Sequence, residues 1–288
     1  MSFTRDIADY PEGIVLAVDK PYRWTSADVI RKLKFAAIRH FQKKILKVGH
    51  AGTLDPLATG VLLVCIGPAC KRAQELQDHD KEYIARIRFG ATTPSYDLEK
   101  EVDRRFPYDH ITGADVEAAL PAFLGDQEQV APLFSAKSVD GVRAYELARK
   151  LYRSGRTSEL DAAALETLHR SRIVISSLEL LDFVPAGIGV PESAATLGDA
   201  PSGQMSPVSA GTSASSRIHV ADTSALGLPE AVIRIACSKG TYIRAFARDL
   251  GEALGSGAHL SGLIRSRSGD YRVEDALSVE QELSLFSW

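Results

Sequence analysis

The chain has 288 residues, of which 45% are hydrophobic and 25% are charged, and these proportions exclude wholesale disorder. The formal net charge is -3, so bulk charge does not indicate a nucleic-acid partner. Only local clusters of basic residues could indicate such a partner. No apolar run approaches the length of a membrane span, and the three cysteines, Cys65, Cys70 and Cys237, cannot all pair with one another. We therefore expect a soluble, cytoplasmic protein.

Hydrophobic periodicity predicts helices and strands that are interspersed along the chain. In chain order we expect a strand at 14–18, a helix that Thr25 or Ser26 caps, strands at 61–66 and 83–89, helices at 114–124 and 144–154, strands at 172–183 and 231–237, and a helix at 241–254. This order has no regular βαβ period. It predicts an α+β fold with a central, mostly antiparallel sheet flanked by helices.

The segment 185–229 differs in composition from its surroundings. It is rich in Pro, Gly, Ser and Ala, and Arg217 is its only Lys or Arg. Such a composition is typical of flexible segments, and this one separates two strands that would otherwise be neighbours. We expect one domain over residues 1–288, with a flexible insertion at 185–229.

The helix that begins near Thr25 has a basic outer surface. No Asp or Glu lies between Asp28 and Asp55. The basic residues of this stretch are Arg31, Lys32, Lys34, Arg39, Lys43, Lys44 and Lys47. Such a surface could bring a polyanion to Asp55, and the alternative is a solvated amphipathic helix.

The run 52–60 holds Asp55 among residues that are typical of turns. Its glycines adopt backbone angles that other residues resist, and Pro56 pushes Asp55 toward an extended conformation. We interpret this run as a loop that holds a catalytic carboxylate in place. An ordinary surface turn is the alternative interpretation.

Three further segments combine reactive side chains with turn residues: 80–83, 237–244 and 258–269. Tyr83, at a strand start, could stack on a base or transfer a proton, or could pack in the core. Arg244 lies near a helix N-terminus, where the helix dipole does not favour a cation. That position predicts a buried carboxylate or phosphate partner, with an ordinary surface arginine as the alternative. The arginines of 258–269 suit phosphates, although a solvated basic loop is the simpler interpretation.

Several common catalytic motifs are missing from the sequence. There is no Gly-rich loop ending in Gly-Lys-Ser or Gly-Lys-Thr, no His-Glu-x-x-His and no Gly-x-Ser-x-Gly, so the usual support for triphosphate, zinc-hydrolase or serine-esterase chemistry is absent. Three histidines follow no ligand spacing, and we expect them at the surface: His40, His79 and His169.

Taken in order, residues 13–21 with Thr25-Ser26, and then residues 47–62, closely resemble the TruB family of tRNA pseudouridine synthases. The resemblance continues through 67–71, 80–83, 145–149, 237–244 and 249–251. It covers residues 13 to about 275 apart from the insertion. It implies a pseudouridine synthase fold.

The resemblance implies that the chain isomerises the T-loop uridine (position 55) of tRNA to pseudouridine by base flipping, without metal or cofactor. Asp55 matches the family's essential aspartate. Tyr83 matches the tyrosine that stacks on the uracil and is the candidate for deprotonating C5, and Arg244 matches the arginine that pairs with the aspartate. Three roles stay open for Asp55: addition to the base, addition to the sugar, or removal of a sugar proton to form a glycal.

The resemblance also implies residues that bind the substrate. His50 would occupy space vacated near the flipped nucleotides, Tyr242 and Leu263 would wall the uracil pocket, and Lys20 and Lys71 would lie near the site. The basic residues of 31–47 and 143–156 would contact phosphates. The expected partner is tRNA, through its T-arm, with no membrane and no guide RNA, and we expect a monomer.

The sequence departs from the family pattern at three places. Arg23 stands where the family usually has Gly, and Lys137 lies one place before the family's lysine. Fewer than twenty residues follow Gly269, which leaves no room for a C-terminal PUA domain and predicts weaker or more salt-sensitive tRNA binding. Two alternatives to the enzyme are a tRNA-binding and folding factor with weak or absent modification activity, and a subunit that works with guide RNAs.

Overall fold

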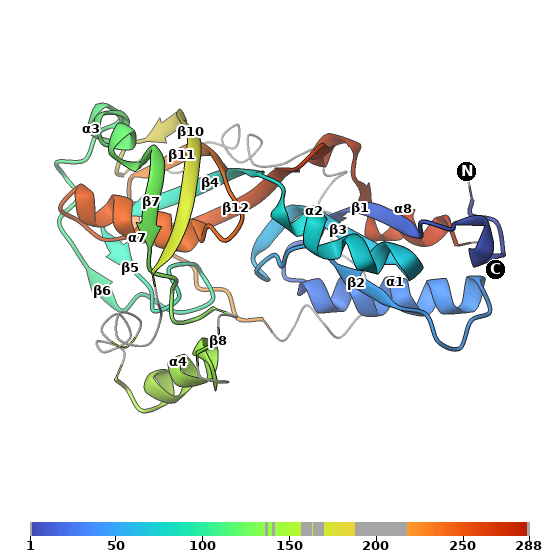
Figure 1. The fold of residues 1–288 in the computed structure, drawn as a ribbon. Coiled ribbons are helices and arrows are strands. Elements are labelled where there is room, and N and C mark those ends of the chain that lie inside the picture. The colour runs from blue at the N-terminus through green and yellow to red at the C-terminus, as the bar shows by residue number, and fades with distance from the viewer. Residues whose placement is uncertain are drawn as a thin grey trace. The chain divides into compact units, whose positions relative to one another are not determined.

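A computed structural model of the chain describes residues 2–135, 138–139, 142–156, 163, 170–187 and 218–286. Within these residues the chain forms two compact units. The first unit contains residues 2–83, 218 and 264–286, and the second contains the described residues of 84–187 and 219–263. Two strands, β4 (Lys81–Phe89) and β12 (Ala258–Ser268), have residues in both units (Figure 1).

The first unit is built on a sheet in the order β14-β1-β3-β12, with β2 on β3 and β13 on β12. Its strands are β1 (Ile14–Lys20), β2 (Val48–His50), β3 (Ala58–Ile66), β13 (Tyr271–Arg272) and β14 (Leu277–Ser278). β1 and β3 are antiparallel, with Lys20 opposite Gly60, whereas β1 and β14 are parallel. Residues of β1 are buried in alternation, and this alternation places Lys20 on the same buried face as Val18.

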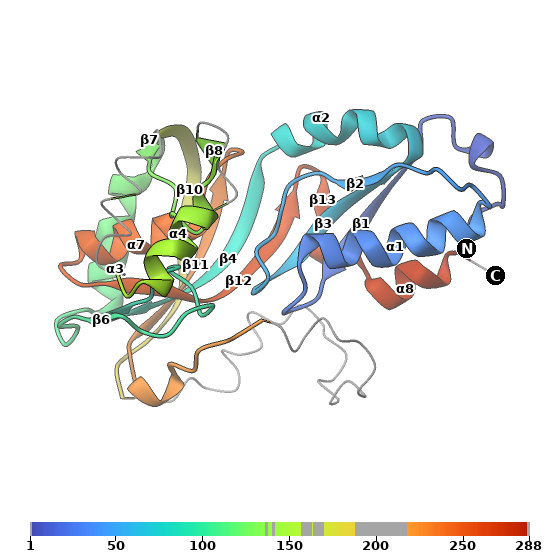
Figure 2. The ribbon, with the colours of Figure 1, turned by 90° about the horizontal axis from the view of Figure 1, so that it is seen from below.

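Helices complete the first unit: η1 (Ile7–Asp9), α1 (Ser26–His40), η2 (Gly67–Arg72), α2 (Ala73–Asp78), η7 (Val273–Asp275) and α8 (Val279–Ser284). Thr25 is the N-cap of α1 and forms a capping box with Asp28, which confirms the predicted helix start. The predicted basic residues of α1 are exposed, while its apolar face packs inward, and α8 packs against α1 (Figure 2).

The second unit has its own strands in the order β12-β4-β11-β10-β7. The strands of this order whose bounds were not given above are β7 (Gly125–Gln129), β10 (Ser171–Val184) and β11 (Glu230–Cys237). Two further pairs of short strands form separate two-stranded sheets: β5 (Ala91–Thr92) with β6 (Arg104–Arg105), and β8 (Ser138–Val139) with β9 (Val142–Arg143). β10 is antiparallel to both β7 and β11. The predicted α+β fold with a mostly antiparallel central sheet is confirmed.

The described helices of the second unit are α3 (Gly113–Ala119), η3 (Leu120–Phe123), α4 (Ala144–Arg153), η6 (Ser224–Leu226) and α7 (Ile243–Ala253). α3 was predicted to continue to residue 124, but it changes to a 3-10 turn at Leu120, because Pro121 has no backbone N–H to donate. α7 buries the predicted apolar stripe, including Phe246 and Leu250.

Two predictions from the sequence are wrong. The segment 258–269 is not a solvated loop, since residues 258–268 form strand β12 and Arg265 within it is 1% exposed. His40 is not a surface residue, because it is 1% exposed at the end of α1 and its Nε2 lies 2.9 Å from the carbonyl oxygen of Thr4. Both misjudgements concern polar side chains that bond to backbone carbonyls inside the fold.

Part of the predicted insertion lies outside the described residues, namely 188–217, as do Lys137 and His169. The described end of the insertion makes contacts. Ala221 and Thr223 are buried, and the amide of Ala221 donates to the carbonyl of Leu98 at 2.8 Å. No helix among the described residues is long and apolar enough to cross a membrane.

Candidate active site

Asp55 lies in the loop that joins β2 to β3 in the first unit. Buried side chains anchor this loop on both sides of the aspartate: Ala51 and Leu54 before it and Leu57 after it. Asp55 itself is half-buried, and its carbonyl accepts from the amide of Ala58 at 3.1 Å, which closes a turn. The loop is therefore held against the core while it leaves the carboxylate partly accessible.

Ser26 fixes the residue before Asp55. Its hydroxyl donates to the carbonyl of Leu54 at 3.1 Å and accepts from the amide of Leu54 at 3.0 Å. Ser26 is buried at the first turn of α1. A two-sided hydrogen bond to one peptide fixes its plane, so α1 sets the backbone orientation next to the carboxylate.

Lys20 fixes the residue after Asp55. This side chain is 0% exposed, and its ammonium donates to the carbonyls of Trp24 at 2.6 Å, Pro21 at 3.1 Å and Pro56 at 3.2 Å. Burial lowers the pKa of Lys20, and the nearby charge of Asp55 acts in the opposite direction. The sequence predicted a lysine near the site, and the structure gives it one backbone partner on the loop itself, Pro56.

Arg23, where the resemblance leads us to expect glycine, has a backbone conformation that glycine adopts more readily than other residues. Its φ is 64°, in the left-handed region. Its amide donates to the carbonyl of Pro56 at 3.0 Å, and its guanidinium donates to the carbonyl of Ile218 at 2.8 Å. The turn at Arg23 thus forms part of the support of the Asp55 loop.

Three other predicted site residues belong to the first unit. His50 ends β2 and is half-buried, and its pKa is lowered by burial and by the charge of Arg265. Tyr83, in β4, is 9% exposed. Lys71 is exposed in η2 and lines a pocket with Ile45, Lys47 and Cys70, among others.

Arg244 belongs to the second unit, in the first turn of α7, and is 6% exposed. It donates to the carbonyls of Ser95 at 3.1 Å and Phe134 at 2.9 Å, and its Nε lies 3.7 Å from Oδ2 of Asp97. Asp97 is 5% exposed, so the buried carboxylate partner that the helix position predicted exists. The pairing with Asp55 that the resemblance implies stays a prediction.

Sequence analysis missed Asp97. Its carboxylate accepts from the hydroxyl of Ser95 at 2.6 Å and from the amide of Glu99 at 2.9 Å, and the intervening Tyr96 has a φ of 57°. A Ser-x-Asp sequence in a turn is the signal that could have identified it. Sequence alone gives no indication that this turn faces α7.

Tyr242 and Leu263 also belong to the second unit and are both half-buried. The side-chain amide of Gln129, at the end of β7, forms two hydrogen bonds with the backbone of Tyr242. Its Nε2 donates to the carbonyl of Tyr242 at 3.1 Å, and its Oε1 accepts from the amide of Tyr242 at 2.8 Å. Gln129 therefore fixes the start of α7 two residues before Arg244. Leu263 lies on β12.

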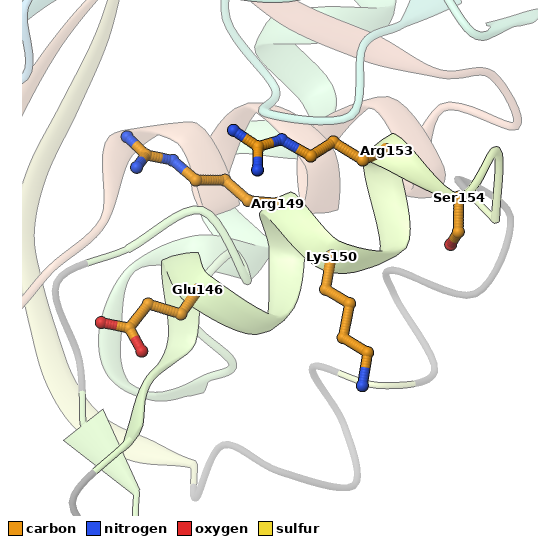
Figure 3. A pocket seen from close by; sticks show the side chains of 5 residues that line it. All are labelled: Glu146, Arg149, Lys150, Arg153 and Ser154. Atoms are coloured by element: carbon orange, nitrogen blue, oxygen red, sulfur yellow. The ribbon is translucent and has the colours of Figure 1, made fainter.

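A basic pocket lies along α4 in the second unit. It is lined by Glu146, Arg149, Lys150, Arg153 and Ser154, and Figure 3 shows the guanidinium groups of Arg149 and Arg153, one turn apart, extending to the same side of the helix. The opposite face of α4 packs its alanines and Leu151 into an apolar cluster. This amphipathic arrangement places three exposed cations, Arg149, Lys150 and Arg153, on the solvent side of the helix.

Across the part of the chain that the structure describes, no group of three or more His, Cys, Asp or Glu residues could hold a metal ion. The predicted independence from metals and cofactors stays a prediction.

Comparison with known proteins defines the class of this chain as a pseudouridylate synthase. The family model described as "TruB family pseudouridylate synthase (N terminal domain)" matches residues 39–183. The tRNA pseudouridine synthase B of Phocaeicola vulgatus is 47% identical over 272 residues, which are 94% of this chain and 92% of that protein. The protein of the same name from Bacteroides fragilis is 45% identical over 93% of this chain and 92% of its own length.

The chain belongs to the TruB family of pseudouridylate synthases, and the predicted enzyme class, a tRNA pseudouridine synthase, is confirmed. Among solved structures, the archaeal box H/ACA sRNP Nop10-Cbf5 complex contains a chain that is 19% identical, with a TM-score of 0.55 over 98% of this chain and 57% of that one. This likeness supports the fold alone. The family model and the named relatives, and not this likeness, support the predicted family, isomerase class and RNA binding.

Proposed function

We propose that the chain converts the T-loop uridine at position 55 of tRNA to pseudouridine and that Asp55 is the essential catalytic group. The observation that carries this proposal is the support of the Asp55 loop. Buried side chains bond to the backbone immediately before and after the aspartate, through Ser26 at Leu54 and Lys20 at Pro56. A surface turn needs no such support, whereas a reacting carboxylate must be held in a defined position.

The reaction explains why a carboxylate is needed at the sugar. The bond between C1′ of the ribose and N1 of the uracil breaks, the base turns within the pocket, and C1′ bonds to C5. The proton at C5 is then removed while N1 acquires one, so the product is an isomer of the substrate and no other reactant is consumed. Asp55 would act at the base or the sugar, and Tyr83 would stack on the uracil and is the candidate for removing the C5 proton.

The target base has to leave its stacked position in the T-loop to reach Asp55, and unstacking costs a few kcal/mol. In this proposal His50 occupies the space near the flipped nucleotides, and Tyr242 and Leu263 wall the uracil. Arg244 would compensate the charge of the aspartate. Lys71 and the exposed basic residues of α1 and α4 would contact the phosphates of the T-arm.

The proposed enzyme acts as a monomer in the cytoplasm, on the T-arm and without a guide RNA. Phosphate contacts from two helices are consistent with recognition of a folded RNA by shape and backbone. A tRNA-binding and folding factor would use the same contacts, but it would not need the backbone support around Asp55.

The test is to incubate unmodified tRNA with the purified protein and to map pseudouridine by a chemical adduct that stops primer extension. We expect a stop at the T-loop uridine with wild type, and a loss of about 10³-fold or more in rate with Asp55→Asn. Asp275→Asn, a change at an exposed aspartate of the same unit, is the matched control and should keep wild-type activity. Equal T-loop signals from wild type and Asp55→Asn would refute the catalytic assignment.

A second substrate tests the position of the modified base. A tRNA in which cytidine replaces uridine 55 should give no adduct in the T-loop. An adduct elsewhere in that tRNA, at the wild-type rate, would show that the enzyme modifies another uridine.

A further inference from the structure

Arg265 is a fully buried arginine in the middle of a strand. It lies on β12 in the first unit, is 1% exposed and is among the largest fully buried side chains of the described residues. A buried guanidinium is stable only when its N–H groups have partners. The identity of those partners therefore indicates why the chain keeps an arginine at this position.

The partners of Arg265 are backbone carbonyls at the two ends of the Asp55 loop. Its Nη2 donates to Gly52 at 3.2 Å and its Nη1 donates to Thr53 at 3.4 Å, both before Asp55. Its Nε donates to Val61 at 2.7 Å, after Asp55 on β3. One planar group thus joins the entry of the loop to the strand that follows its exit.

The backbone of Arg265 lies equally close to the exit of the loop. Gly60 has a φ of 92°, and a Cβ atom placed on it would lie 2.3 Å from the carbonyl oxygen of Arg265. Only glycine permits this approach. β12 and β3 therefore meet where the loop ends, and this close contact fixes the point from which the guanidinium reaches back to Gly52 and Thr53.

Arg265 and Lys20 act on different carbonyls of the same loop. Lys20 reaches Pro56, after Asp55, and Arg265 reaches the two residues that lie two and three places before it. The charge of Arg265 also lowers the pKa of both Lys20 and His50, so the guanidinium lies within electrostatic range of the residues around the loop. Asp55 is the acidic member of this group and acts on Lys20 in the opposite sense.

We infer that Arg265 is a positioning residue of the catalytic loop: its guanidinium holds the entry and exit of the loop together so that Asp55 is presented in one orientation. This inference rests on the proposed catalytic role of Asp55. Lysine cannot replace the arginine fully, because an ammonium lacks the planar fork of donors that meets several carbonyls from one side. The role is distinct from contact with the substrate, since the side chain is buried.

The experiment compares Arg265→Lys and Arg265→Met with wild type in steady-state assays on unmodified tRNA, with rates corrected for the folded fraction. We expect kcat to fall about tenfold or more with Arg265→Lys and further with Arg265→Met, while KM changes less than threefold, because misplacing a reacting group by about 1 Å costs on the order of 10²-fold. Arg267→Lys is the matched control, since Arg267 lies on the same strand and donates to Gly269 outside the loop.

Hydrogen exchange of the peptide that covers residues 50–60 gives a second measurement. It should become faster in Arg265→Lys and stay unchanged in Arg267→Lys. If Arg265→Met does not fold, Arg265→Lys decides the question by these two measurements. Wild-type kcat, or unchanged exchange of residues 50–60, in a folded Arg265→Lys variant would overturn the inference.

Asp55→Asn, measured in parallel, separates this inference from the proposed function. If Asp55→Asn is inactive and Arg265→Lys is fully active, the positioning role is wrong and the catalytic assignment stands. If Asp55→Asn keeps wild-type activity, the proposed function itself is wrong.

Discussion

The ammonium of Lys20 lies 3.2 Å from the carbonyl oxygen of Pro56, the residue that follows Asp55. The same ammonium donates to Pro21 and Trp24, so all three of its N–H donors have backbone acceptors. The side chain is buried because β1 continues its alternation to its last residue. A strand of the core thereby contributes a cation that fixes the conformation next to the proposed catalytic carboxylate.

Replacing Lys20 with methionine should destabilise the protein and lower its activity. Methionine fills similar space, but it leaves the carbonyls of Pro21, Trp24 and Pro56 without this donor, and each unsatisfied buried carbonyl costs about 1–3 kcal/mol. Because the amide of Arg23 also donates to Pro56, we expect a total loss of about 2–4 kcal/mol in the free energy of unfolding. Urea denaturation measures it.

Lys32→Met is the control for this prediction, because Lys32 is exposed on α1. Its effect on the free energy of unfolding should stay within about 0.5 kcal/mol. Equal stability of the Lys20→Met and Lys32→Met variants would show that the buried ammonium contributes nothing to the fold.

Gly60→Ala should be among the most damaging changes of one methyl group in the chain. The residue has a φ of 92°, and its Cβ would lie 2.3 Å from the carbonyl oxygen of Arg265. Left-handed strain costs about 1–2 kcal/mol and overpacking costs about 1–3 kcal/mol more. The expected result is a loss of about 2–5 kcal/mol in the free energy of unfolding, together with lower kcat.

Gly49→Ala provides the comparison for Gly60→Ala. Gly49 lies on β2, in the strand that enters the same loop, and no heavy atom lies within 4 Å of the Cβ that it would gain. Thermal unfolding of both variants should place Gly49→Ala near wild type and Gly60→Ala well below it. Similar melting temperatures would contradict the close packing of β12 on β3.

The fold could be predicted from sequence wherever one periodicity dominated a segment. The apolar face of α1 and its Thr25 cap, the alternation of β4 and the stripe of α7 each have a local signal, and each element appears where that signal is strongest. β12 lacks such a signal, because Arg265 interrupts its apolar residues. The carbonyl of Val61, to which Arg265 donates, lies 204 residues earlier in the chain, so local patterns cannot reveal this partner.

The candidate site divides in the same way. Asp55, Tyr83 and Arg244 each lie in a segment with a local signature, and the family resemblance adds His50 and assigns the roles. The hydrogen bonds that hold the loop have no local signal, because Ser26 and Lys20 reach the loop from α1 and β1. Their roles depend on tertiary contacts, and the same residue types in another fold would be a helix cap and a strand-end lysine.

The stability of the first unit should depend on pH through Glu282 of α8. This carboxylate is 2% exposed, its Oε2 lacks a hydrogen-bond partner among the described residues, and burial raises its pKa to about 7. An unfolded glutamate has a pKa near 4.5. Between these two values the unfolded chain releases the proton while the folded chain keeps it, so the free energy of unfolding falls as pH rises.

Glu282→Gln should remove this dependence, because glutamine stays neutral at every pH. We expect wild type to lose about 2 kcal/mol of stability between pH 5 and pH 8 through this group. The variant should lose correspondingly less and be the more stable protein at pH 8. Urea midpoints at four pH values measure the difference, with the exposed neighbour Glu280→Gln as the control. Parallel pH profiles for wild type and Glu282→Gln would show that Glu282 ionises in the folded protein as it does in the unfolded chain.

The basic pocket of α4 should contribute to tRNA affinity and to its salt dependence. Its three cations, Arg149, Lys150 and Arg153, lie on the exposed part of a helix whose other face is fixed in an apolar cluster. Each phosphate contact releases counterions and adds about 0.7–0.9 to the slope of log K against log salt concentration. Changing all three to glutamine should therefore weaken binding and reduce that slope by about 2–3, while kcat at saturating tRNA stays near wild type.

Glu146→Gln tests whether this effect belongs to charge and not to the helix itself. Glu146 lines the same pocket. Its neutralisation should leave the affinity for tRNA unchanged or raise it, because it removes a negative charge that repels the phosphates. Filter binding at several salt concentrations measures both variants. If the triple variant keeps the wild-type slope, the cations of α4 do not contact phosphates in the complex, and the T-arm contacts must lie on α1 or elsewhere.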